Sequence, residues 1–381
     1  MMKISLLSIF LLILIRSSAQ TVGLFYNDPG SLAGYILFAP GGSDSTYLID
    51  KCGKRVHTWF SSYLPGLSVH LNTDGTLLRC GGENNAIFNS GGSGGILEKF
   101  DWNDSLLWSF EISDQNECQH HEAIQLPNGN VLAIVWQKFT KSEAIDNGRD
   151  PASVGNELWS DKILEIEPIG TDSGVVVWQW NAWDHLIQDF DSTKQNFGVV
   201  ASHPELIDIN AANQTAETDW LHCNSIDYNS HFDQILISCH NLNEVWIIDH
   251  STTMAEAVTH SGGQSGKGGD LLYRWGNPQI YNRGTSVDQK FFGQHNATWI
   301  PAGLPDAGKI LVFNNGIGRP DGLYSTVETF TPPDVVNYNY PIVGSNPYGP
   351  TNQDWVYEAN PPTSFFSQVE GGAQRLSTGI H

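Results

Sequence analysis

Basic residues are scarce in this chain of 381 residues, which has 19 Lys and Arg against 41 Asp and Glu and a formal net charge of -22. Nucleic acids and anionic membranes are bound through clustered basic side chains, so this balance argues against both as main partners. An anionic substrate would have to be held by a few local cationic or hydrogen-bonding groups, because the overall field repels it.

Long apolar runs are absent beyond the first 20 residues. Residues 4–15 are almost wholly apolar, follow the short basic start at Met1–Lys3 and precede small residues at 17–20. Twelve apolar residues are too few to span a bilayer, so residues 1–20 are predicted to be a signal peptide. We therefore expect residues 21–381 to be a single exported domain, periplasmic or secreted, with no membrane span. The five cysteines then lie in a compartment that permits disulfides, and their odd number leaves at least one unpaired.

Helical periodicity is nearly absent as well. Short β-branched or aromatic runs, such as residues 35–38, 175–178 and 235–237, lie between clusters of Gly, Asn, Asp and Pro. With 40% hydrophobic residues the chain can build a sizeable core, so disorder is excluded. The pattern predicts an all-β protein of many short strands.

Two kinds of hairpin alternate along the chain. One kind pairs a strand with a second strand that ends in or near Trp, at residues 46–59, 96–108 and 162–180. The other kind surrounds a tight turn, at residues 71–78, 125–132, 227–236, 299–312 and 375–379. Two hairpins make four antiparallel strands, which is one blade of a β-propeller. The last hairpin reaches its turn at Gly379 just before the chain stops, so we expect the last blade to be truncated.

Histidines recur at one position of this repeat, just before the inner strand of a hairpin. The second unit has His120 and His121 there, the third has His222, and the fourth has His295. Equivalent positions on different blades point to the same axis, so four imidazoles are predicted to meet at one end of the channel. A histidine cluster can also bind a metal, but the spacings are long, His-x-Glu-x-x-His is absent and acidic neighbours are few, so no metal is predicted.

Three motifs together resemble the PAPS-independent bacterial aryl-sulfate sulfotransferases. They are His120-His121-Glu122 with residues 126–130, residues 219–225 with Asp227-Tyr228, and residues 293–297, and the resemblance runs from about residue 46 to residue 374. It implies a six-bladed propeller that moves a sulfuryl group from a phenolic sulfate ester to a phenolic acceptor through a sulfated histidine, without a cofactor.

The resemblance also implies roles for individual residues. His295, in the Gly-Gln-His motif, corresponds to the nucleophile, and His121 (or His120) and His222 correspond to supporting residues of the site. Asn224 and Asn296, within the same motifs, are expected to contact the substrate.

One departure from the family concerns His240, which stands where the family has an Arg, 18 residues after His222. A titratable imidazole thus replaces a permanent guanidinium, which changes how an anion is bound. If Asp227 faces Ile235 in the hairpin, position 222 pairs with 240 and 223 with 239. The two imidazoles then share one face, and Cys223 and Cys239 share the other, where they could form a bridge.

The other departure lies at the N-terminus. Better-known members of the family carry a large N-terminal β-domain that pairs subunits, whereas here the propeller begins almost directly after the signal peptide. The resemblance therefore implies no particular oligomeric state.

The chemistry of sulfuryl transfer suits a set of imidazoles. It requires a nitrogen nucleophile, cationic or hydrogen-bonding groups around three oxygens, and an acid for the departing phenolate. Two other classes of function stay open. A catalytically impaired propeller would bind carbohydrate or protein without turnover, and a metal-dependent hydrolase would lose activity to a chelator and release free sulfate.

Overall fold

The computed structural model describes residues 24, 26–211 and 218–379, so the predicted signal peptide lies outside the described residues. Short strands dominate, and the two α-helices are α1 (Lys141–Asp146) and α2 (Met254–Ala257). None of the described helices is long and apolar enough to cross a membrane. The strands are β1 (Tyr35–Phe38), β2 (Ser45–Asp50), β3 (Arg55–Phe60), β4 (Leu64–Leu71), β5 (Leu77–Gly82), β6 (Gly95–Phe100), β7 (Leu106–Glu111), β8 (Glu117–Gln125), β9 (Val131–Thr140), β10 (Glu157–Ile169), β11 (Ser173–Asn181), β12 (Leu186–Ile187), β13 (Ile207–Asp208), β14 (Cys223–Asn229), β15 (Gln234–Cys239), β16 (Glu244–Asp249), β17 (Tyr273–Trp275), β18 (His295–Trp299), β19 (Ile310–Asn314), β20 (Thr326–Phe330) and β21 (Trp355–Glu358).

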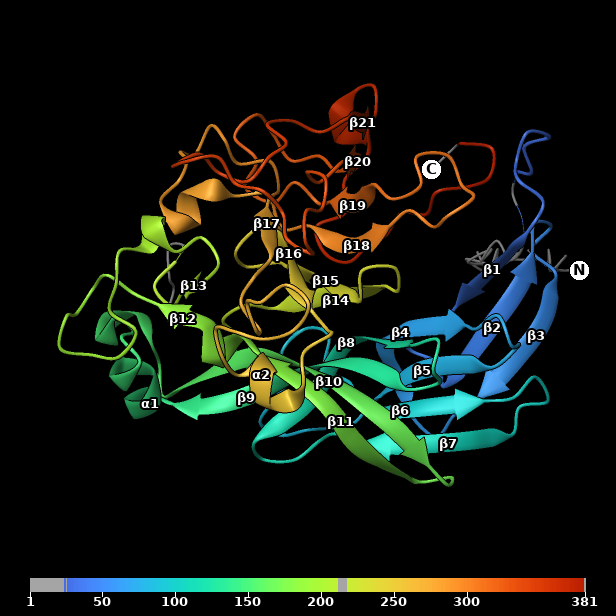
Figure 1. The fold of residues 1–381 in the computed structure, drawn as a ribbon. Helices are drawn as coiled ribbons and strands as arrows, with labels where there is room; N and C mark the ends of the chain where they lie inside the picture. Colours follow the sequence, from blue (N-terminus) through green and yellow to red (C-terminus); the bar gives the residue numbers. More distant parts are fainter. Residues whose placement is uncertain (1–23, 25, 212–217, 380–381) are drawn as a thin grey trace, which may run out of the picture.

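Apart from one short parallel pair, the strands form separate antiparallel sheets arranged around a common centre (Figure 1). Four of the sheets have four strands in chain order: β4–β7, β8–β11, β14–β17 and β18–β21. Strands β1, β2 and β3 form a three-stranded sheet, and β12 and β13 form a short parallel pair. Each four-stranded sheet is two consecutive hairpins, so the predicted β-propeller of four-stranded antiparallel blades is confirmed.

The predicted number of six blades is wrong for the described chain, which forms five. The predicted hairpins at residues 71–78, 125–132, 227–236 and 299–312 are present as β4–β5, β8–β9, β14–β15 and β18–β19. The predicted hairpin at residues 375–379 contributes no strand. A ladder needs a partner strand for its backbone N–H and C=O groups. Arg375 instead donates to the carbonyl of Gly379 within this turn.

Each innermost strand is irregular where it nears the centre. The register of β4 shifts between Pro65 and Val69, and comparable shifts occur in β8, β14 and β18. A left-handed residue other than glycine lies at or beside each shift: Leu67, His121, His222 and Asn296, with φ of 80°, 51°, 53° and 52°. Bulges re-aim side chains, and left-handed backbone at a non-glycine residue persists only where its surroundings enforce it. The irregularities therefore direct these side chains toward the centre of the ring.

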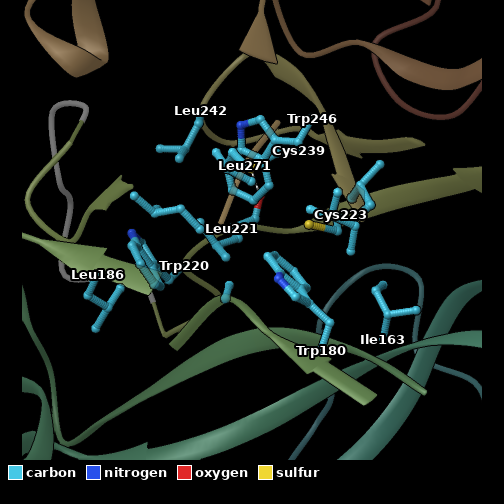
Figure 2. Packing of buried hydrophobic residues seen from close by; sticks show 14 of the residues in the cluster. Ile163, Trp180, Leu186, Trp220, Leu221, Cys223, Cys239, Leu242, Trp246 and Leu271 are labelled. Carbon is cyan, nitrogen blue, oxygen red and sulfur yellow. Dashed lines mark hydrogen bonds between the residues drawn. The ribbon is translucent and has the colours of Figure 1, made fainter. Parts of the chain in front are cut away.

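The largest apolar core lies between the second and third four-stranded blades (Figure 2). Trp180 and Ile163 of one blade pack in the same cluster as Trp246, Cys223 and Cys239 of the next. All five side chains are fully buried. Because Cys223 and Cys239 are the chain neighbours of His222 and His240, this packing fixes the backbone that carries both histidines.

A fully buried ion pair ties β16 to β17. Arg274 donates to both carboxyl oxygens of Glu244, at 2.6 to 3.1 Å, and Trp246 donates to the same carboxyl group at 2.7 Å. Neither Arg274 nor Glu244 is exposed to solvent. Removing one member leaves the other charge buried without its partner.

We predict that Glu244→Gln lowers the free energy of unfolding by about 3 kcal/mol or more, because the Arg274 guanidinium then stays buried and uncompensated. Urea unfolding followed by tryptophan fluorescence measures this change. Asp146→Asn is the matched control, because it breaks the exposed pair with Lys194 and should cost less than about 1 kcal/mol. Equal effects of the two substitutions would contradict the prediction.

Candidate active site

Five of the predicted histidines come together at the centre of the ring. His121 lies on β8, His222 directly precedes β14, His240 directly follows β15, and His295 begins β18. Ring centroids are 4.5 Å apart between His121 and His222, 5.2 Å between His222 and His240, and 5.2 Å between His240 and His295. We call these four residues the histidine row. His120 packs behind the row, with its ring 5.1 Å from that of His121.

A cavity of about 260 Å³ opens beside the two ends of the row. Its walls are Leu67, Ser68, His121, Glu122, Asn224, His295, Asn296, Glu370 and Gly371. Both predicted substrate-contacting asparagines therefore lie at the cavity. No Lys or Arg is among the described residues that line it. An anion in this cavity would have to be held by imidazole and amide groups.

The hairpin that carries His222 and His240 has a different register from the one predicted at its turn. Asp227 pairs with Leu236 rather than Ile235, but the register shifts by one residue between Cys223 and Ser225, so Cys223 still faces Cys239. The backbone N–H of His240 donates to the carbonyl of His222 at 3.3 Å, and the two rings are neighbours. All five cysteines are free thiols, so the bridge that this pairing allowed is not formed.

The proton on His295 is fixed by two oxygen acceptors. Nδ1 of His295 lies 2.7 Å from Oδ1 of Asn315 and 3.2 Å from the carbonyl oxygen of Gly293. The Asn315 amide is held in this orientation because its Nδ2 donates to the carbonyls of Ser367 and Glu370. Both partners of Nδ1 accept, so Nδ1 carries the hydrogen and a neutral His295 has its lone pair on Nε2.

The His295 ring is neutral at physiological pH. Burial, followed by the neighbouring His240, lowers the pKa of His295 to about 4. The ring is 8% exposed and lines the cavity. A neutral imidazole with an unprotonated Nε2 at a cavity wall is a competent nitrogen nucleophile.

Oxygen acceptors also hold Nδ1 of the two middle histidines. Asp219 accepts from Nδ1 of His222 at 2.5 Å, and Oδ1 of Asn241 accepts from Nδ1 of His240 at 2.8 Å. Trp136 donates to the other oxygen of Asp219 at 3.0 Å. Burial raises the pKa of Asp219, but the hydrogen bond and the charge of His222 outweigh burial, and the net pKa is lowered. Asp219 is therefore a carboxylate placed to stabilise a positive charge on His222.

His121 has a different partner from the other three. Its Nδ1 lies 2.8 Å from Nδ1 of His120, a nitrogen that can either donate or accept. Burial lowers the pKa of both His120 and His121 well below the ordinary value, so both rings are neutral. The other ring nitrogen of His120, Nε2, lies 2.7 Å from Oδ1 of the fully buried Asp161.

The residues that hold the row in place were missed by the sequence analysis. Asp219 and Asn241 lie close to His222 and His240 in the chain, and Asp219 opens one of the three motifs, so a signal existed for these two. Asp161 and Asn315 come from β10 and from the residue after β19, and nothing nearby in the sequence marks them.

Within the residues that the structure describes, one group of three side chains has ligand atoms close enough to share a metal ion: His185, His260 and Asp270, all within 4.8 Å of one another. This group lies outside the histidine row. Asp270 accepts from both imidazoles at 2.7 to 2.8 Å, and the other ring nitrogen of His185 lies 2.9 Å from the carbonyl of Ala257. Hydrogen bonds account for these contacts.

We predict that the wild-type protein loses more stability below neutral pH than His295→Gln does. The pKa of His295 is about 4 in the folded chain and about 6.5 in an unfolded chain, so the unfolded state takes up the proton first as pH falls. The stability contribution is present above pH 6.5 and is lost as pH falls toward 4. Between pH 7 and pH 5 the wild type should lose about 2 kcal/mol more than the variant in urea unfolding. Equal losses would show that His295 is not held neutral.

Comparison with known proteins shows the family to which the chain belongs. No curated protein matches the chain. Solved structures to which the chain is similar include a hydrazine synthase from Kuenenia stuttgartiensis (11% identity, TM-score 0.40, covering 76% of this chain and 67% of that one). Another is a hypothetical selenium-binding protein from Sulfolobus tokodaii (13% identity, TM-score 0.42, covering 79% of this chain and 61% of that one). At such low sequence identities and TM-scores, neither likeness supports a conclusion about this chain. The sequence profile of the Arylsulfotransferase (ASST) family matches residues 41–338, and the chain therefore belongs to the arylsulfotransferase family.

Proposed function

We propose that this protein is an aryl-sulfate sulfotransferase that moves a sulfuryl group from a phenolic sulfate ester to a phenolic acceptor through a sulfohistidine at His295. The observation that carries the proposal is the fixed tautomer of His295, whose Nδ1–H is held by Asn315 and Gly293. Because the ring is neutral, Nε2 can attack sulfur while the bond from sulfur to the phenolic oxygen breaks. In the second half of the reaction the acceptor phenol attacks the sulfur bound to His295.

Negative charge in this reaction spreads over three sulfuryl oxygens. With no Lys or Arg lining the described part of the cavity, the stabilising charge would come from His222, whose Nδ1 hydrogen bond to the Asp219 carboxylate favours a protonated ring. His240 lies beside it, and the amides of Asn224 and Asn296 reach the cavity. Of these groups, His240 stands at the position where the resemblance places the family's arginine.

The departing phenolate needs a proton, and the tautomers of the row select its donor. His240 and His295 face oxygen acceptors at Nδ1, so their neutral rings carry no hydrogen on Nε2, whereas the Asp219 carboxylate keeps the proton of His222 on that ring to stabilise the sulfuryl charge. His121 can accept a hydrogen bond at Nδ1 from His120 and carry its hydrogen on Nε2. We assign His121 as the acid for the leaving phenolate and as the base for the incoming phenol.

The substrates that fit this scheme are two small phenolic molecules, one carrying a sulfate ester. The ester itself brings the sulfuryl group, so neither half of the reaction requires a cofactor. Residues 1–20 have the pattern of a signal peptide, and we propose that the protein is exported to the periplasm or beyond.

His295→Ala should abolish turnover of p-nitrophenyl sulfate while leaving the fold intact, because it removes the nucleophile. Wild-type protein incubated with donor alone should gain one sulfuryl group on the peptide that carries His295. Steady-state kinetics with donor and phenol should give the parallel lines of a ping-pong mechanism. His231→Ala, which alters an exposed histidine, is the matched control and should keep full activity. A fully active His295→Ala protein would overturn the assignment.

His240→Arg should flatten the decline of activity above neutral pH. An imidazole ordinarily loses its charge near neutrality, whereas a guanidinium keeps it. We expect the ratio of kcat/KM at pH 6.5 to that at pH 8.5 to fall by roughly tenfold in the variant, equivalent to about 1.4 kcal/mol of transition-state stabilisation. An unchanged pH profile would show that His240 does not bind the sulfuryl oxygens.

A further inference from the structure

Two fully buried groups behind the histidine row lack ordinary hydrogen bonds. Asp161 lies on β10 with a fully buried side chain, and although the backbone N–H and thiol of Cys223 approach its carboxyl group, no hydrogen bond of good geometry reaches either of its carboxyl oxygens. Nε2 of His120 also lacks one, and it lies 2.7 Å from Oδ1 of Asp161. Buried polar atoms without partners are rare and call for an explanation. Nε2 of His120 and Oδ1 of Asp161 are therefore within hydrogen-bond distance of each other.

Asp161 and His120 are connected to the cavity through His121. Nδ1 of His120 lies 2.8 Å from Nδ1 of His121, and His121 lines the cavity. The ring of His120 is stacked on Trp136 at a centroid distance of 4.0 Å and an angle of 5°, which fixes its plane. Asp161, His120 and His121 thus form a chain of three side chains from the core to the site.

The proton on Asp161 decides which tautomer the two histidines adopt. If Asp161 is a carboxylate, it requires a hydrogen on Nε2 of His120, which leaves Nδ1 of His120 to accept from His121. His121 then has no hydrogen on Nε2 and cannot donate to a substrate. If Asp161 is protonated, it donates to His120, His120 donates to His121, and Nε2 of His121 carries a hydrogen at the cavity.

The electrostatic surroundings favour the protonated acid. Burial, with the nearby Asp219 carboxylate adding to it, raises the pKa of Asp161 well above its ordinary value, although His222 and Cys223 act in the opposite direction. Burial keeps His120 and His121 neutral. Of these three side chains, Asp161 is therefore the acid that is protonated at neutral pH, while both histidines are neutral.

We propose that Asp161 and His120 form a buried proton relay that makes His121 the acid of the sulfuryl transfer, a role that rests on the proposed function. As the bond from sulfur to the phenolic oxygen breaks, its electron pair stays on oxygen, which takes the hydrogen from Nε2 of His121. His121 takes a proton at Nδ1 from His120, and His120 takes one at Nε2 from Asp161, which becomes a carboxylate. The incoming phenol returns one proton along the same path. Asp161 and His120 are positioning residues, because they act through His121.

The test compares aryl sulfates whose leaving phenols differ in acidity, with wild-type protein and with Asp161→Asn. An asparagine can donate a hydrogen bond to His120 but cannot give up the proton. The rate of His295 sulfation by phenyl sulfate, whose phenol has a pKa of about 10, should fall by about 100-fold in the variant. The rate with p-nitrophenyl sulfate, whose phenolate leaves with little help, should fall by less than about threefold, so the dependence on leaving-group pKa becomes steeper.

Asp270→Asn is the matched control, because Asp270 is a buried aspartate that pairs with histidines outside the row. It should lower stability without changing the dependence on leaving-group pKa. An equal loss for every aryl sulfate in Asp161→Asn would overturn the relay and leave the proposed function standing. No sulfation of His295 by any aryl sulfate in the wild-type protein would overturn both.

A measurement on the wild type covers the case in which Asp161→Asn fails to fold. Rates of phenyl sulfate turnover in mixtures of H2O and D2O should follow a curved line, because more than one proton moves in the transition state. A straight line would mean that a single proton moves, and the relay would be wrong.

Discussion

The candidate site depends on holding four imidazoles close together in a largely water-free place. Imidazole rings whose centroids are 4.5 to 5.2 Å apart cannot all be protonated, because like charges this close repel each other. The protonation state and tautomer of each ring therefore have to be fixed. In each ring, the group that faces Nδ1 determines where the hydrogen lies. That group is another imidazole for His121, a carboxylate for His222, and an amide oxygen for His240 and His295. The four rings have the same intrinsic chemistry, and their hydrogen-bond partners give them different tautomers and protonation states.

Those differences divide the chemistry among the rings. An amide oxygen at Nδ1 leaves the neutral His295 with a lone pair for attack, and a carboxylate at Nδ1 lets His222 hold positive charge. Only His121 faces a nitrogen that can donate. Under the proposed function, a strongly acidic protein could in this way act on a sulfate ester, because positive charge would arise at one ring beside the sulfuryl group rather than over the whole surface.

The backbone brings the rings to one place through irregularity rather than through regular pairing. Left-handed residues next to register shifts occur on four successive innermost strands, and two of them are His121 and His222. Such backbone is unfavourable for residues other than glycine, and it is sustained by dense packing behind it. Around His222 that packing is the cluster of Trp180, Trp246 and the two free cysteines (Figure 2).

The sequence alone determined the fold class, the hairpins that make the blades and the histidines that meet, because turn residues, strand periodicity and in-register repeats are local signals. It also placed Cys223 opposite Cys239, although through a register at Asp227 that is wrong by one residue and is corrected by the bulge. The number of six blades, which came from the family resemblance, was too high, because the described chain forms five blades and the turn near residue 379 contributes no strand.

Only the tertiary structure decided which proton each ring carries. Asn315 lies 20 residues from His295, and Asp161 lies 41 residues from His120, and each approaches its histidine because separate strands of the propeller pack side by side. A pKa and a tautomer depend on burial and on the atom that faces each nitrogen. Neither quantity is encoded in the residues next to the histidine, since both arise from contacts between different strands of a blade and between blades.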